Sequence, residues 1–159
     1  PRGDGPGTET PITLSEAFLI QQSKLSDQVA LQIIREGQTK GTNNIFQYTW
    51  SHFFEMSMSF AKMMHALDVP ERSTVLISGY NSPEHLAAIM GTVLSNCIFS
   101  DIYVTQSPEL CMSFVRRLKV QVIVCDTYKR LKEKFLHSRK ELVDLGIKAA
   151  VLFGEGITP

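Results

Sequence analysis

The chain has 159 residues, of which 43% are hydrophobic and 20% are charged, and its formal net charge is zero. This length and composition predict one globular domain that buries roughly two-thirds of the surface of its unfolded chain. No apolar run approaches the roughly 20 residues that span a bilayer, and the polar N-terminus lacks the pattern of a signal peptide. We therefore expect a cytoplasmic protein, or one peripheral to a cytoplasm-facing membrane.

The first residues predict an arm followed by a helix. Residues 1–11 are rich in Gly and Pro, and we expect them to form a disordered arm. The chain begins without a methionine, and we expect it to be part of a longer protein. Thr13 and Glu16 have the spacing of a capping box, which predicts a helix that begins there and runs to Gln22.

A hairpin and a long helix are predicted next. Apolar runs at residues 29–34 and 45–49 flank a polar, glycine-containing loop at 36–44, which is typical of two antiparallel strands with a long connection. Thr49 is a suitable cap for a helix over residues 50–67. The large apolar side chains of that helix recur with a period of 3.6 residues, which predicts that they pack in the core rather than form a lipid or partner groove.

Short apolar runs alternate with helical segments in the middle of the chain. The runs at residues 74–78, 98–104 and 122–125 are predicted to be strands. The helices between them begin at Ser82 and Ser107, each in the tripeptide Ser-Pro-Glu. The serine hydroxyl caps free N–H groups, proline suits the first helical position, and glutamate suits the positive end of the helix dipole. This alternation predicts βαβ units with parallel strands.

A fifth helix at residues 128–145 and a last strand at 149–153 complete the pattern. The fifth helix is expected to pack through four apolar side chains: Leu131, Phe135, Leu142 and Leu145. The chain is therefore predicted to have an α/β fold, with a mostly parallel sheet flanked by helices and an N-terminal β-hairpin, in one unit over residues 12–159.

The first place to look for a site is the carboxyl end of the sheet, where parallel α/β folds bind their ligands. The turns at residues 79–81 and 105–106 follow predicted strands. Tyr80 and Asn81 are therefore candidates to border a crevice for a substrate. A simpler interpretation remains open, in which Asn81 precedes the helix cap and only fixes the turn.

Basic residues are concentrated late in the chain. Residues 116–140 carry nine basic and two acidic side chains. Such a block suits an anionic membrane surface or a phosphate-bearing ligand, or it is the solvated side of a helix. The candidate patch consists of four residues: Lys129, Arg130, Lys132 and Lys134.

Several known reactive motifs are absent from the sequence. It has no GxxxxGK[ST] phosphate loop and no GxGxxG, and it has no G-x-S-x-G elbow. The four histidines lie far apart and are expected to have surface or packing roles, and the three cysteines are expected to be buried, reduced thiols. Without a stacking platform interleaved with lysines, nucleic acid is not an expected partner. The residues alone thus indicate an α/β domain without a reactive centre.

Three motifs carry a resemblance to a known family. Residues 45–50 resemble the xYTW strand, residues 79–85 resemble a GxNSPEW turn, and residues 100–109 resemble a GIYxTxSPE turn. Over about residues 12–155 the chain resembles the N-terminal part of the AMP-forming acyl-CoA synthetases, in the adenylate-forming superfamily, and especially their long-chain and bubblegum-type members. It departs from the pattern at His85, where the family has an aromatic residue, and at Asp101, where the family has glycine.

A third departure is at residues 95–97, which are Ser-Asn-Cys where the family has Ala-Gly-Gly. The resemblance implies that the full-length protein activates a long-chain fatty acid with ATP and Mg²⁺ to an acyl-adenylate and then transfers it to coenzyme A. The family's phosphate loop, adenine-binding motifs, Mg²⁺-associated glutamate and mobile C-terminal domain lie beyond the matched region. We therefore expect this chain to be truncated before the phosphate loop, to bind no cofactor itself and to be inactive alone.

In this interpretation the chain is a wall of the N-terminal domain, and its partners are the rest of that domain and the C-terminal domain. Surface that such partners cover would be apolar and exposed here, and the chain is expected to self-associate through it. Two alternatives stay open: a self-contained Rossmann-like or flavodoxin-like binding or interaction module, and a non-catalytic homologue used in assembly. A Ser/Thr/Gly-rich loop ending in Pro-Lys-Gly after Pro159 would favour the ligase.

Overall fold

The structure is a computed structural model of the chain, and it describes residues 10–36 and 43–153. Most of the N-terminal arm expected at residues 1–11 and most of the loop expected at 36–44 lie outside the described residues, as do all residues after 153.

A four-stranded parallel sheet forms the centre of the fold, with the strand order β4-β3-β5-β6. Its strands are β3 (Thr74–Ser78), β4 (Ile98–Asp101), β5 (Val120–Cys125) and β6 (Ala149–Leu152). Every pairing between them is parallel. The two central strands are buried along almost their whole length, as expected of a parallel sheet covered on both faces. The predicted α/β fold is confirmed.

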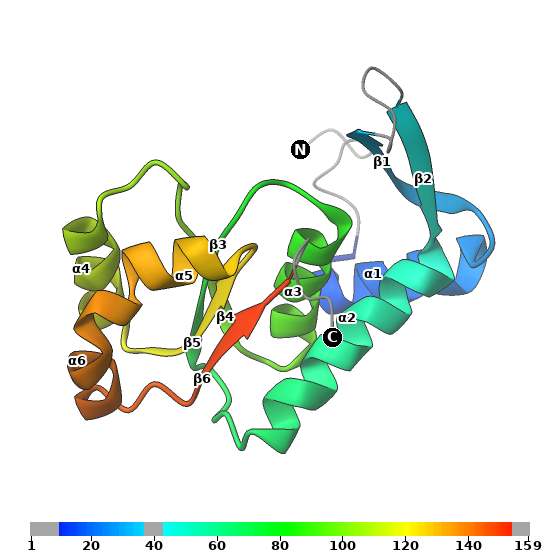
Figure 1. Ribbon diagram of the computed structural model, residues 1–159. Helices are drawn as coiled ribbons and strands as arrows, with labels where there is room; N and C mark the ends of the chain where they lie inside the picture. Colours follow the sequence, from blue (N-terminus) through cyan, green and yellow to red (C-terminus); the bar gives the residue numbers. More distant parts are fainter. Residues whose placement is uncertain (1–9, 37–42, 154–159) are drawn as a thin grey trace, which may run out of the picture.

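Helices cover both faces of this sheet (Figure 1). On one face α3 (Pro83–Leu94) lies against the sheet and α2 (Trp50–Ala66) packs against α3. On the other face the buried side chains belong to α4 (Pro108–Leu118), α5 (Tyr128–Lys134) and α6 (Arg139–Asp144). Leu76 of β3 points to this second cluster while its neighbours point to the first, which is the alternation of a strand.

The N-terminal elements form a third, smaller cluster beside α2 and α3. They are α1 (Leu14–Leu25), β1 (Val29–Glu36) and β2 (Asn43–Thr49), and the two strands form the predicted antiparallel hairpin. Phe18 of α1 packs edge-on against Phe53 of α2, with ring centroids 5.1 Å apart. Because an isolated hairpin is marginally stable in water, this cluster is what anchors it.

The helix starts predicted from capping residues are confirmed. Ser82 and Ser107 each accept a hydrogen bond from the backbone N–H three residues later, with proline at the first helical position. Thr13 forms a complete capping box with Glu16, and Thr49 caps α2. Local sequence therefore fixes where these four helices begin.

The prediction of one continuous fifth helix over residues 128–145 is wrong. The chain forms α5, a 3₁₀ turn η2 (Leu136–Ser138) and then α6. An unbroken helix of 18 residues would be about 27 Å long, whereas β5, with six residues, spans only about 20 Å. The break at Phe135 (φ −131°, ψ −44°) keeps that ring completely buried and turns the chain back toward β6. It leaves Leu145, which was expected in the core, 40% exposed.

The strand predicted at residues 98–104 is also shorter, because it ends at Asp101. Its partner β3 has only five residues, and the ladder closes with the hydrogen bond from the Ile102 N–H to the Ile77 carbonyl. The residues after Asp101 are thereby free to line the carboxyl edge of the sheet.

We expect Gly91→Ala to destabilise the protein by about 1–3 kcal/mol, although alanine favours an isolated helix over glycine. A Cβ at Gly91 would lie 2.6 Å from the Ser57 carbonyl oxygen and 2.7 Å from Phe60 Cβ, so α2 and α3 would have to separate. Urea unfolding measures the change. Ser59→Ala on the exposed side of α2 is the control and should change stability by less than about 0.5 kcal/mol. A Gly91→Ala variant at least as stable as the wild type would contradict the close contact.

Candidate functional site

A crevice of about 470 Å³ opens at the carboxyl ends of β3 and β4. It is lined by seven residues of the two segments that follow these strands: Gly79, Tyr80, Asn81, Asp101, Ile102, Tyr103 and Val104. The structure thus places both predicted crevice residues, Tyr80 and Asn81, in the same lining. Thr105 and Gln106, from the second predicted turn, are not part of it.

Close packing under the crevice requires glycine at position 79. A Cβ there would lie 2.9 Å from Phe153 Cζ and 3.0 Å from Asp126 Cβ. Phe153 follows β6, and Asp126 follows β5. The segments after three strands therefore meet at Gly79, and a side chain at this position would collide with those that follow β5 and β6.

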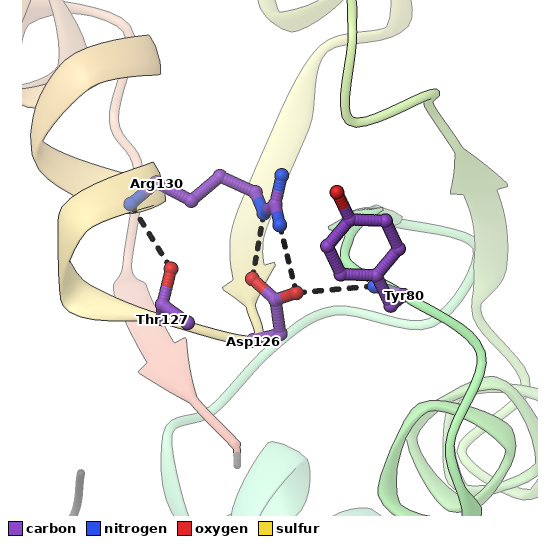
Figure 2. A network of polar contacts seen from close by, with 4 residues as sticks. All are labelled: Tyr80, Asp126, Thr127 and Arg130. Carbon is purple, nitrogen blue, oxygen red and sulfur yellow. Dashed lines mark hydrogen bonds and ion pairs between the residues drawn. The ribbon is translucent and has the colours of Figure 1, made fainter. Parts of the chain in front are cut away.

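Asp126 ties this turn to α5 (Figure 2). Its carboxylate accepts a hydrogen bond from the Tyr80 N–H at 3.1 Å and two from the Arg130 guanidinium, at 2.6 Å and 2.9 Å. The guanidinium carbon also lies 5.1 Å from the centroid of the Tyr80 ring, within the range of a cation–π contact. Thr127 caps α5 by accepting a hydrogen bond from the Arg130 N–H. The network holds both the backbone and the ring of Tyr80.

The charges in this network stabilise each other. Burial alone would raise the pKa of Asp126, but the hydrogen bonds from Arg130 and Tyr80 outweigh it and hold the pKa of this carboxyl below its ordinary value. The Asp126 carboxylate in turn raises the pKa of Arg130. Only 12% of the Arg130 side chain and 11% of the Asp126 side chain are exposed, so the pair is poorly screened by water.

A second polar contact joins the two sides of the crevice. His85, in the first turn of α3, is 2% exposed, and its Nε2 lies 3.1 Å from Asp101 Oδ2. Its ring meets Phe153 edge-on, at 5.8 Å between centroids. Of the surface or packing roles expected for the histidines, His85 has the packing role, but its ionisable partner was not predicted. The only signal for the pair was that both residues depart from the family pattern.

The four basic residues of the candidate patch do not form one surface. The Arg130 guanidinium is paired with the Asp126 carboxylate, and the Lys134 ammonium donates a hydrogen bond to the Gln106 carbonyl. Lys129 and Lys132 are exposed, three residues apart on α5 and therefore on one side of that helix. Any anionic partner of α5 would meet these two lysines first.

The described residues 10–36 and 43–153 contain no group of three or more His, Cys, Asp or Glu side chains that is arranged to hold a metal ion. Cys97, Cys111 and Cys125 are free and buried, as expected, and burial raises the pKa of the Cys125 thiol to about 12. None of the helices in this part of the chain is long and apolar enough to cross a bilayer.

The chain matches the model of a known protein family over most of its length. The model of the AMP-binding enzyme family matches residues 21–154. The chain belongs to this family. It is 31% identical over 148 residues to the long-chain-fatty-acid–CoA ligase ACSBG1 of Rattus norvegicus, and 29% identical over 132 residues to ACSBG2 of Mus musculus. These alignments cover 93% and 83% of the chain, but in both cases only 19% of the relative.

Solved structures of adenylate-forming enzymes share the fold. The coronafacic acid ligase from Pectobacterium brasiliense superposes with a TM-score of 0.72 at 11% identity, over 92% of this chain and 26% of that one. The anthranilate CoA ligase AuaEII gives a TM-score of 0.70 at 13% identity, over 94% and 27%. The arrangement of this AMP-binding enzyme segment is thus found in one part of larger ligases.

We expect Asp126→Ala to cost about 2–3 kcal/mol, because it leaves the nearly buried Arg130 guanidinium without its carboxylate and the Tyr80 N–H without its acceptor. Urea unfolding at pH 7 measures the loss, and amide exchange at Tyr80 should accelerate. Asp144→Ala, an exposed carboxylate on α6, is the matched control. Equal losses in the two variants would contradict a structural role for the Asp126 network.

The same variant gives a pH test. Because the folded pKa of Asp126 is depressed, its contribution is complete well above the ordinary value of 3.8 and is lost as the pH falls through the depressed folded value. The stability difference between wild type and Asp126→Ala should therefore be constant near neutrality and should shrink below about pH 4. A difference that grows on acidification would exclude this account.

Proposed function

We propose that residues 12–159 form the scaffold of the N-terminal domain of an AMP-forming long-chain fatty-acid–CoA ligase, truncated before the phosphate loop. In the longer protein, ATP and Mg²⁺ would convert the fatty acid to an acyl-adenylate with release of pyrophosphate, and coenzyme A would displace AMP. The observation that carries this proposal is the 31% identity to a long-chain-fatty-acid–CoA ligase over 93% of the chain. The shared topology of other ligases supports it.

The composition of the crevice supports a scaffold role for this segment. Among the described residues, its lining offers one carboxylate, from Asp101, and no lysine, arginine or histidine. Stabilising the charge that develops on a triphosphate needs cationic groups or a metal ion. The Arg130 guanidinium, which lies over the Tyr80 ring, is already paired with Asp126. We infer that this segment alone binds ATP weakly or not at all, and that the reactive groups belong to the remainder of the ligase.

Tyr80 and Asn81 are proposed to border the acyl or nucleotide crevice. They lie at the carboxyl end of β3, the usual position of ligands in α/β sheets. Tyr80 is 68% exposed, while its backbone is tied to Asp126. An exposed ring on a fixed backbone is suited to contact a ligand without a large loss of conformational freedom.

A second candidate function is a non-catalytic interaction module, because the chain exposes apolar surface. Ile98 and Phe99 on the edge strand β4 are 55% and 40% exposed, and Ile34 and Ile45 on the hairpin are each 60% exposed. Exposed apolar residues on an edge strand favour association. In the ligase, the rest of the N-terminal domain and the C-terminal domain are the proposed partners; an isolated segment would self-associate.

The activity is tested by fatty-acid-dependent release of pyrophosphate with palmitate, ATP and Mg²⁺. We expect none from the 159-residue chain and turnover from the protein extended to its full length, because the resemblance places the phosphate loop, the adenine-binding motifs and the C-terminal domain outside the matched residues. Replacing the lysine of that loop by alanine should abolish turnover. Palmitate-dependent pyrophosphate release by the 159-residue chain would contradict the scaffold proposal, and an inactive extended protein would favour the interaction module.

The candidate patch is tested by sedimentation with liposomes that contain phosphatidylserine. Charge reversal of Lys129, Arg130, Lys132 and Lys134 together should abolish binding, but Arg130 and Lys134 also have structural contacts. Lys129→Glu with Lys132→Glu is the sharper variant, since each basic residue near an anionic surface contributes about 1 kcal/mol. Lys24→Glu with Lys62→Glu, both exposed, is the matched control. Unchanged sedimentation of the α5 double variant would remove the membrane proposal.

A further inference from the structure

The contact between His85 and Asp101 fixes the orientation of the one acidic side chain that the described part of the chain places in the crevice lining. An ionised carboxylate only accepts hydrogen bonds, so His85 Nε2, at 3.1 Å from Asp101 Oδ2, is assigned the proton. The imidazole itself is held on several sides. The main-chain N–H of His85 donates a hydrogen bond to the Ser82 hydroxyl, and the imidazole ring packs against Phe153.

Asp101 is also held at its backbone. It is the last residue of β4, paired with Ile77 of β3, and the next N–H donates to the Ile77 carbonyl. Asp101 Oδ2 accepts the hydrogen bond from His85. The second carboxylate oxygen of Asp101 has no hydrogen-bond partner among the described residues 10–36 and 43–153. The Asp101 side chain is 44% exposed. The result is an oriented acceptor with one oxygen available to the crevice.

Packing alone does not account for this pair. An apolar side chain would fill the space of His85 without leaving a polar atom unsatisfied, yet Nδ1 of His85 is buried and has no partner in the described part of the chain. A buried polar atom without a partner is destabilising. Such a cost is typical of groups that serve a site.

The remaining lining indicates what the acceptor would meet. Tyr80 and Tyr103 are 68% and 79% exposed, and both residues line the crevice with Asp101. Flat rings with hydroxyl groups contact flat or chain-like ligands. A carboxylate beside them favours a group that donates hydrogen bonds and repels an anion.

We propose that Asp101 is a ligand-contacting residue of the crevice and that His85 is its positioning residue. The crevice then selects a ligand that presents an ammonium, amide or hydroxyl group at this point and rejects one that presents an anion. The inference rests on the proposed function only in calling that ligand part of the substrate. Binding in the crevice is a separate property of the 159-residue chain.

Three probes share a phenyl ring and differ in the charge of the attached group at pH 7, so they separate the contribution of that charge from that of the ring: 2-phenylethylamine, 2-phenylethanol and phenylacetate. We follow the amide resonances of residues 80–81 and 101–104 in a ¹H–¹⁵N titration. The amine should bind about threefold to fivefold more tightly than the alcohol, as for a partly exposed ion pair, and the acid should bind most weakly. Equal affinities for the amine and the acid, or no shift of these amides with any probe, would overturn the inference.

Variants of the two residues test their roles. Asp101→Asn should bring the affinity for the amine down to that for the alcohol, whereas Asp144→Asn, an exposed control, should leave the ratio unchanged. His85→Leu should reduce the ratio, and His85→Gln, which keeps an N–H at a similar reach, should restore most of it. If Asp101→Asn retains the preference, the ligand contact is excluded, and if His85→Leu retains it, the positioning role is excluded.

If His85→Leu does not fold, the wild type, His85→Gln and Asp101→Asn are compared instead. A ratio of amine to alcohol affinity in His85→Gln as low as in Asp101→Asn would overturn the positioning role. Pyrophosphate release by the extended protein is measured independently of these titrations. If the extended protein is active but the crevice binds the amine and the acid equally, this inference alone is overturned. If the crevice prefers the amine but the extended protein is inactive, the ligase proposal alone is overturned.

Discussion

The burial of the two central strands, β3 and β5, is the constraint on which the rest of the structure depends. Helices cover both of their faces, so their side chains are apolar almost throughout and their backbone groups are paired inside the sheet. Polar side chains are thereby excluded from the strands and confined to the strand ends. Since all four strands run in the same direction, the segments after them meet at one edge, and the crevice forms there.

What the sequence predicts well is local. The Ser-Pro-Glu starts at Ser82 and Ser107 need only residues within one turn, and the strands between them are short apolar runs with helices on either side. These signals were sufficient for the parallel sheet and the hairpin, and the family motifs agreed with them. The placement of Tyr80 in the crevice followed from the same reasoning, because the end of a strand is known once the strand is known.

What the sequence did not predict depends on residues far apart in the chain. The contact between Tyr80 and Asp126 joins positions 46 residues apart, and that between His85 and Asp101 joins positions 16 apart, so no local period signals them. The break at Phe135 is set by the width of the sheet that the helix must cover, which is a property of the assembled fold. The same is true of Arg130, which looked like part of a solvated basic block until its carboxylate partner was in place.

The two polar contacts at the crevice bear on the choice between a scaffold with a substrate-side edge and a plain interaction module. Buried ion pairs and hydrogen bonds add little net stability compared with apolar packing, but they fix one geometry. Here they fix the backbone of Tyr80 and the carboxylate of Asp101, which both line the crevice, whereas the exposed Ile34 and Ile45 lie on the hairpin. A module that worked through its apolar surface would gain nothing from this arrangement. A ligase whose substrate passes the carboxyl edge of the sheet would gain a fixed wall, which is why the geometry favours the ligase scaffold.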